Sequence, residues 1–198
     1  LEIKDVKYNL IKKGNSNTEF LGNTMIEIEK ILKDELPDKV IVYGDCDTTL
    51  AGAIVSNKLE IQLIHIESGM RSYNKNMPEE INRIIVDNLS DILLCSTQDS
   101  IDNLRKENII KNVFFVGNIH IELLKYCKKR IILNKLNDKY CLLTIHRKSN
   151  TTPNMLKKIF NVLKEIKLKI KFLLHPRTRK IIETNNIKIP DNIEIMNP

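Results

Sequence analysis

The sequence contains no tryptophan, and aromatic side chains make up only 5% of its 198 residues. Nucleic-acid-binding proteins commonly combine a basic patch with aromatic side chains that stack on bases. The chain carries a formal charge of +7, but its lysines are spread along it among isoleucines and asparagines. We therefore expect no nucleic-acid partner, whereas a small anionic substrate is compatible with the charge.

The four cysteines show no paired spacing, and the sequence has neither a signal peptide nor an apolar run long enough to span a bilayer. It also lacks a His-x-x-x-His motif, which argues against a metal site. These absences predict a cytoplasmic protein without disulfides or membrane contact. The chain begins at Leu1 and ends at Pro198 directly after a predicted strand, so we expect a piece of a longer protein.

Helical and extended patterns alternate along the chain. Met25, Ile28 and Leu32 recur at helical spacing, and Pro78 suits the first position of a helix. The patterns predict a helix that begins at residue 78 and helices over residues 22–36, 46–59, 98–106, 119–128, 153–166 and 178–184. They predict strands over residues 40–43, 61–66, 91–96, 113–116, 140–145, 171–174 and 192–196.

This alternation is typical of α/β proteins in which helices cover both faces of parallel sheets. A basic, asparagine-containing segment at residues 129–139 is the predicted linker between two such units. We assign residues 1–128 to most of an N-terminal Rossmann-like domain and residues 140–198 to the first part of a C-terminal one. With 42% apolar residues the chain can form two small cores, and we expect the two units to face each other across a cleft.

Ionisable side chains follow four of the predicted strands. Ligands of open α/β sheets bind outside the carboxyl ends of the strands, so these side chains predict the site of an enzyme. The residues are Asp45, Glu67, His146, Arg147, His175 and Arg177.

Carboxylates dominate the first unit. Glu67 follows a buried strand and Glu79 opens a helix shortly after it, so the two could act as general acid and base in different environments. Asp45 could accept a proton or a hydrogen bond at the end of its strand. In the simpler alternatives, Asp45 and Asp47 only cap a helix. Glu79 and Glu80 then complement the helix N-terminus, and Arg83 pairs with Glu79.

Imidazole and guanidinium groups dominate the second unit. His146-Arg147 and His175-Pro-Arg177 can position a phosphate or a nucleotide, because arginine offers a planar fork to oxyanions. A hydrogen-bonded structural histidine is the alternative at each place. Serine-nucleophile chemistry is poorly supported, since Ser68 lacks the flanking glycine of a nucleophile elbow.

Six short motifs follow one another in a characteristic order. They are Gly44-Asp-Cys-Asp-Thr-Thr-Leu-Ala-Gly52, His65-Ile-Glu-Ser-Gly-Met-Arg-Ser72, Met77-Pro-Glu-Glu-Ile-Asn-Arg83, Val116-Gly-Asn118, Thr144-Ile-His-Arg147 and His175-Pro-Arg-Thr-Arg-Lys180. Together they closely resemble the motifs of non-hydrolysing UDP-N-acetylglucosamine 2-epimerases. Several independent motifs in register make this resemblance more specific than any one of them.

The resemblance implies a two-domain, glycosyltransferase-B-like fold with a nucleotide-binding C-terminal domain. It also implies a homodimer that acts on a UDP-sugar and needs neither a nicotinamide nor a metal. The implied reaction interconverts UDP-N-acetylglucosamine and UDP-N-acetylmannosamine by elimination and re-addition of UDP, through a 2-acetamidoglucal. By motif position, the implied catalytic residues are Asp45, Glu67, Glu79 and His146. The implied substrate-binding residues are Arg71, Arg83, Arg147, His175 and Arg177.

The chain also departs from the family's pattern. Cys46 replaces a usual threonine, Ser68 a usual alanine and Ser149 a usual glutamate. The sequence is roughly half the family's usual length and lacks the family's opening Arg-Pro-Glu turn and late Asp-Ser-Gly-Gly segment. The alternatives are a hydrolysing 2-epimerase, which releases N-acetylmannosamine and UDP, and a non-catalytic sugar-nucleotide-binding relative. The Arg71 segment favours the non-hydrolysing branch.

Overall fold

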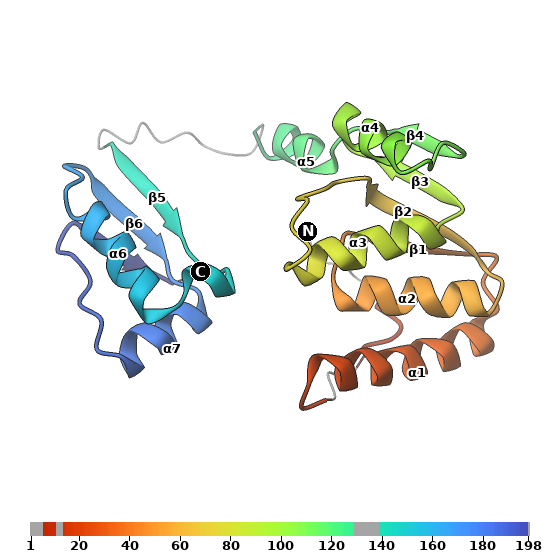
Figure 1. Cartoon of the computed structure of the whole chain (residues 1–198), viewed down its shortest axis with the longest axis horizontal. Helices are drawn as coiled ribbons and strands as arrows, with labels where there is room; N and C mark the ends of the chain where they lie inside the picture. The colour runs from red at the N-terminus through yellow and green to blue at the C-terminus, as the bar shows by residue number, and fades with distance from the viewer. Residues whose placement is uncertain (1–5, 11–13, 129–138, 198) are drawn as a thin grey trace. The chain divides into compact units, whose positions relative to one another are not determined.

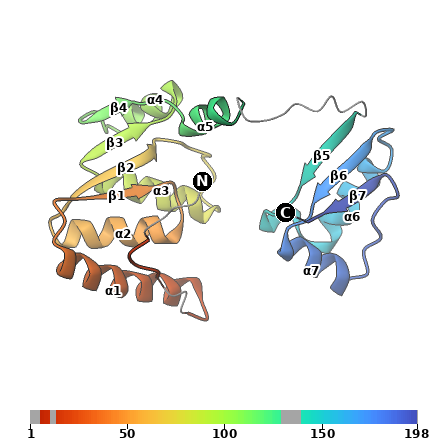
Figure 2. The same ribbon diagram turned by 180° about the vertical axis from the view of Figure 1, so that it is seen from behind.

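The computed structural model describes residues 6–10, 14–128 and 139–197 of the chain. The chain divides into two compact units, Leu1–Arg130 and Ile131–Pro198 (Figures 1 and 2). The predicted linker, residues 129–139, lies outside the described residues except for its last position. Each unit contains one parallel sheet, which confirms the predicted α/β class.

The first unit contains a four-stranded sheet in the order β1-β2-β3-β4. Its elements are α1 (Asn17–Glu35), β1 (Lys39–Tyr43), α2 (Asp47–Lys58), β2 (Gln62–Ser68), α3 (Pro78–Leu89), β3 (Ile92–Cys95), α4 (Gln98–Lys106), β4 (Val113–Phe115) and α5 (Ile119–Lys128). Each strand pairs with the strand that follows it in the chain, so the sheet grows in one direction. Right-handed crossovers therefore place α2, α3 and α4 on the same face of the sheet. Helix α1 packs beside α2 (Figure 1).

The two faces of this sheet differ in how well they are covered. Val42 and Leu63 point toward the helices and are buried, at 7% and 1% exposure. Ile41 and Tyr43 alternate with them on the opposite face and are 62% and 42% exposed. Within the described residues, the predicted helical cover is therefore present on one face and incomplete on the other.

Local capping explains why α1 begins five residues before the predicted start at residue 22. The Ser16 hydroxyl accepts a hydrogen bond from the Glu19 amide at 3.1 Å, and the Glu19 carboxylate accepts one from the Asn15 amide at 2.7 Å. This capping arrangement satisfies one amide of the first turn and one directly before the N-cap. The first turns are polar, so apolar periodicity alone did not reveal them. Helix α1 ends where Leu36 adopts a left-handed conformation, with φ of 47°.

The second unit contains a three-stranded parallel sheet in the order β5-β6-β7. Its elements are β5 (Tyr140–Thr144), the short 3-10 turn Lys148–Asn150, α6 (Pro153–Leu163), β6 (Lys169–Leu173), α7 (Pro176–Thr184) and β7 (Ile193–Met196). The rings of Phe160 on α6 and Phe172 on β6 pack edge to face, with centroids 6.2 Å apart. Leu156 and Ile170 are completely or almost completely buried beside them. The unit thus has its own apolar core.

None of the helices in the described ranges combines the length and the apolar character that a membrane crossing requires.

Candidate functional site

Two predicted acids lie at the carboxyl ends of neighbouring strands. Asp45 follows β1 after Gly44, whose φ of 72° allows the chain to turn. Strand β2 ends at Ser68, two residues later than predicted, and so includes Glu67. Glu67 lies at a bulge, where the register with β3 shifts between Ile66 and Ser68. Glu67 itself has a φ of 69°, an uncommon value for a residue other than glycine. The bulge redirects the Glu67 side chain at the end of the strand.

Arg83, from α3, brings these two carboxylates together. Its Nη2 atom lies 2.5 Å from Oδ2 of Asp45 and 3.8 Å from Oε2 of Glu67. Its Nη1 atom donates a hydrogen bond to the Glu67 carbonyl oxygen. The Arg83 side chain is only 7% exposed, whereas the Asp45 and Glu67 side chains are 36% and 21% exposed. The acids are therefore open to a ligand, while the arginine lies behind them.

The alternative interpretations of Asp45 and Arg83 do not describe this geometry. The carboxylate of Asp45 binds Arg83, while the N-cap of α2 is Cys46, which makes no side-chain capping bond. The Asn82 amide donates to the Asp45 carbonyl and to Oδ1 of Asp47, both at 3.0 Å. Arg83 points toward Asp45 and not along α3 toward Glu79.

The adjacent acids Glu79 and Glu80 differ sharply in their surroundings. Glu80 is buried and accepts hydrogen bonds from the Ser72 amide at 2.7 Å, the Ser72 hydroxyl at 2.9 Å and the Tyr73 amide at 3.0 Å. Burial acts to raise the pKa of Glu80, but these hydrogen bonds and the charge of Arg71 lower it overall. Glu79 is exposed, and its side chain makes no hydrogen bond or ion pair with any part of the chain that the structure describes. Glu80 thus holds the loop that contains Ser72 and Tyr73, whereas the Glu79 carboxylate is accessible to a ligand.

We expect the contribution of Glu80 to stability to depend on pH. Its lowered pKa means that the ionised form stabilises the fold above its unfolded pKa and that this stabilisation is lost as pH falls through the folded pKa. In Glu80→Gln, the deficit in free energy of unfolding should therefore shrink as pH falls from about 6 to about 3. Urea denaturation at several pH values measures this deficit, with exposed Glu60→Gln as the matched control. A deficit that stays constant with pH would contradict the assignment.

A cavity of about 720 Å³ opens at the carboxyl ends of the first sheet. Glu67 lines it together with Tyr43, Phe115 and Asn118, the last from the Val-Gly-Asn motif. Partial burial and the nearby negative charge of Glu67 raise the pKa of Tyr43, so its hydroxyl stays protonated and can donate. This volume is typical of small-molecule sites.

The second unit gathers three of its four predicted residues at the carboxyl end of its sheet. The rings of His146 and His175 are 5.9 Å apart, and Nη1 of Arg177 donates to the His146 carbonyl at 3.3 Å. His175 also caps α7, because its Nδ1 atom accepts the Arg177 amide at 3.2 Å. Arg147, the fourth, follows His146 in the chain and is exposed. His175 therefore has, at least in part, the role of a hydrogen-bonded structural histidine.

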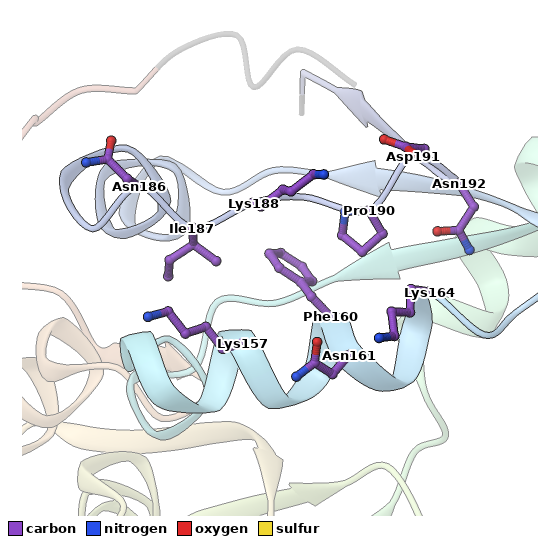
Figure 3. Close-up of a pocket in the computed structure, with 10 residues that line it drawn as sticks. All are labelled: Lys157, Phe160, Asn161, Lys164, Asn186, Ile187, Lys188, Pro190, Asp191 and Asn192. Carbon is purple, nitrogen blue, oxygen red and sulfur yellow. The ribbon is translucent and has the colours of Figure 1, made fainter.

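A second hollow in this unit, of about 730 Å³, contains none of the predicted residues (Figure 3). Figure 3 shows Phe160 rising from α6 toward Ile187 and Pro190, with lysines around the rim. Asn192 donates its amide protons to the carbonyls of Leu163 and Ile166, at 3.0 and 2.9 Å, so it fastens the end of α6. We therefore place the candidate site at the carboxyl ends of the strands.

Buried ionic contacts hold Arg71, for which a substrate contact was predicted. Its side chain is 1% exposed, pairs with Asp87 at 2.7 Å and binds both carboxylate oxygens of Glu107, at 2.7 and 2.6 Å. Burial acts to lower the pKa of Arg71, but its bonds to Glu107 and Asp87 raise it further above its ordinary value. Sequence reasoning missed Asp87, although it lies one turn after Arg83 and two turns after Glu80. The helical spacing of the polar residues Glu80, Arg83 and Asp87 could have indicated that they share one face of α3.

Within the described ranges, no group of three or more histidine, cysteine, aspartate or glutamate side chains is arranged to hold a metal ion.

Comparisons with known proteins agree with the motifs. The family model described as UDP-N-acetylglucosamine 2-epimerase matches residues 1–198. A UDP-N-acetylglucosamine 2-epimerase homolog of Methanococcus maripaludis is 40% identical over 100% of this chain and 59% of its own length. The UDP-2,3-diacetamido-2,3-dideoxy-D-glucuronate 2-epimerase of Pseudomonas aeruginosa is 37% identical over 100% of this chain and 58% of its own. The chain thus spans about three-fifths of these curated relatives.

Solved structures give the same result. A crystal structure of the Methanocaldococcus jannaschii UDP-GlcNAc 2-epimerase in complex with UDP-GlcNAc and UDP matches 98% of this chain and 59% of that one, with a TM-score of 0.85 and 38% identity. The Neisseria meningitidis UDP-GlcNAc 2-epimerase bound to UDP-GlcNAc matches 96% and 57%, with a TM-score of 0.77 and 30% identity. The similarity therefore extends to both units of the chain.

Proposed function

Because the chain belongs to the UDP-N-acetylglucosamine 2-epimerase family, we propose that the whole protein interconverts UDP-N-acetylglucosamine and UDP-N-acetylmannosamine. The observation that carries this proposal is the pair of accessible carboxylates, Asp45 and Glu67, at the ends of adjacent strands around one buried arginine. Such carboxylates suit proton transfer at a sugar carbon. A UDP-sugar is also an anion, in keeping with the positive charge of the chain.

The proposed reaction has two stages. A carboxylate takes the proton from sugar carbon 2 while the bond between carbon 1 and the UDP oxygen breaks, which yields UDP and a 2-acetamidoglucal. An acid then returns a proton to carbon 2 on the other face, and UDP adds back to carbon 1. Atoms and electrons balance without a redox step, and no cofactor takes part in the proposal.

Each unit supplies part of the proposed site. Asp45, Glu67 and Glu79 are the candidate acid and base groups of the first unit. His146, with Arg147, His175 and Arg177 in second rank, would hold the nucleotide and diphosphate. The proposal requires both sets of residues to act on one substrate. We also propose that the whole protein is a homodimer in the cytoplasm. Since Arg71 and Arg83 are buried in ion pairs, we assign them to positioning the loop and the carboxylates instead of direct substrate contact.

UDP-2,3-diacetamido-2,3-dideoxy-D-glucuronate is a second candidate substrate, because a 2-epimerase for this sugar nucleotide is 37% identical to the chain. A direct comparison of the two UDP-sugars would identify the preferred one. A hydrolysing reaction would instead release free N-acetylmannosamine, and a non-catalytic relative would bind the sugar nucleotide without turnover.

We expect the full-length gene product to exchange solvent deuterium into carbon 2 of UDP-N-acetylglucosamine, since a proton removed by a carboxylate mixes with water before its return. Mass spectrometry and proton NMR of the recovered nucleotide sugars measure the label. Label in both epimers without free sugar supports the reversible reaction. Release of N-acetylmannosamine would indicate the hydrolysing branch, and folded protein that incorporates no label would refute the proposal.

A further inference from the structure

His65 is the fourth residue of β2 and is completely buried, as is the carboxylate of Asp87 beside it. Its two ring nitrogens face two different oxygen atoms. Nδ1 lies 2.7 Å from Oδ1 of Asp87, and Nε2 lies 2.8 Å from the Gly44 carbonyl oxygen. A carbonyl oxygen only accepts, so Nε2 carries a proton and donates it.

The Asp87 carboxylate also accepts on its other oxygen. Oδ2 receives the Gly69 amide at 3.1 Å and Nη1 of Arg71 at 2.7 Å. A carboxyl group that accepts from an arginine and an amide is favoured in its ionised, acceptor-only form. Nδ1 of His65 therefore also donates, and the ring carries a proton on each nitrogen.

Charges balance within this buried group. The imidazolium of His65 and the guanidinium of Arg71 flank Asp87, and Glu107, whose side chain is 32% exposed at the edge of the group, pairs with the far side of Arg71 at 2.6 Å. Two cations thus face two anions. Such a complete arrangement is what a buried ionic cluster needs to be stable.

This cluster touches the proposed site through one residue, Gly44. Its amide donates to the Ile66 carbonyl at 3.1 Å, and its carbonyl accepts from His65, so β2 holds the peptide group on each side of Gly44. Asp45 comes next in the chain. The orientation of the Gly44–Asp45 peptide determines where the Asp45 carboxylate points.

We propose that His65 and Asp87 are positioning residues, which form a buried imidazolium–carboxylate pair that fixes the Gly44 carbonyl and so places the Asp45 carboxylate for proton transfer. The catalytic part of this role rests on the proposed function. Displacement of a reacting group by about 1 Å can cost about a hundredfold in rate, so loss of the Gly44 bond should lower kcat with little change in KM.

The protonation of His65 is tested by nitrogen-15 NMR of the ring in the wild-type full-length protein. The two ring nitrogens have similar chemical shifts in an imidazolium and widely separated shifts in a neutral ring. We expect similar shifts in the wild type and separated shifts in Asp87→Asn, whose amide can donate to a neutral ring. A neutral His65 in the wild type would overturn the ion pair.

A matched pair of variants tests the positioning role. Glutamine at residue 65 places an amide nitrogen near the position of Nε2 and keeps the bond to Gly44, whereas asparagine mimics Nδ1 and keeps only the bond to Asp87. We expect kcat to fall about threefold in His65→Gln and about thirty- to a hundredfold in His65→Asn, with KM within about twofold in both. Circular dichroism checks that both variants fold.

The outcomes separate the two proposals. Equal kcat values in the two variants, or a lower value in His65→Gln, would overturn the positioning role. A wild type that shows the imidazolium but exchanges no deuterium at carbon 2 would refute the proposed function and leave the ion pair standing.

Discussion

Replacing Glu67 with glutamine is expected to lower kcat by about two to four orders of magnitude, because the amide keeps the size of the side chain but neither accepts nor returns a proton. The fold should survive, since the contact of Arg83 with the Glu67 carbonyl belongs to the main chain. The Glu67 side chain is also partly exposed and lies 3.8 Å from the arginine. Steady-state kinetics with both epimers and the rate of deuterium exchange measure the loss.

Glu60→Gln is the matched control for this substitution. Glu60 is exposed and precedes the amino end of β2, whereas Glu67 lies near its carboxyl end. The control should keep wild-type kcat and KM. Activity in Glu67→Gln within a few-fold of the control would remove Glu67 from the proton-transfer step and leave Asp45 and Glu79 as the candidates.

Truncating Asp87 to alanine should destabilise the protein by about 3–5 kcal/mol, the usual cost of removing one partner of a buried ion pair. The substitution leaves Arg71 and His65 facing each other, and their side chains are 1% and 0% exposed. It also leaves the Gly69 amide without its carboxylate acceptor. The loss is measured by urea denaturation followed by circular dichroism.

Asp102→Ala provides the comparison for this measurement. Asp102 forms an ion pair with Arg105 at 3.2 Å on the surface of α4, where the two side chains are 43% and 66% exposed. Solvent screens such pairs, so the change should stay within about 1 kcal/mol. If the two aspartate variants lost similar stability, the buried cluster would not contribute as described.

Most of the fold could be predicted from the sequence. The alternation of helices and parallel strands is confirmed, with α4 and α5 at the predicted bounds and α3 at its predicted start, Pro78. Apolar periodicity reports which residues are buried, and buried residues define these elements. The start of α1 and the extension of β2 to Ser68 were missed, because a polar capped turn and a bulge leave no such periodicity.

The candidate site was predictable in its acids but not in their partners. Strand ends marked Asp45 and Glu67, because parallel strands bring their carboxyl ends to one edge of a sheet. The sequence named Glu79 as a catalytic candidate and left open that both Glu79 and Glu80 only complement the helix N-terminus. Adjacent helical residues differ by about 100° in direction, so only packing shows which one points inward. The structure buries Glu80 and exposes Glu79.

The sequence by itself determined the order of the motifs along the chain, the class of fold and the ionisable residues at the ends of the strands. Only the tertiary structure decided which ionisable side chains meet: Arg83 with Asp45, 38 residues apart, and His65 with Asp87, 22 residues apart. Helical or extended spacing shows which side chains share a face, but the partner of a buried ionisable group depends on which helix or strand packs against that face. That is why Arg71 and Arg83, both expected at the substrate, are found in ion pairs with carboxylates from other parts of the chain.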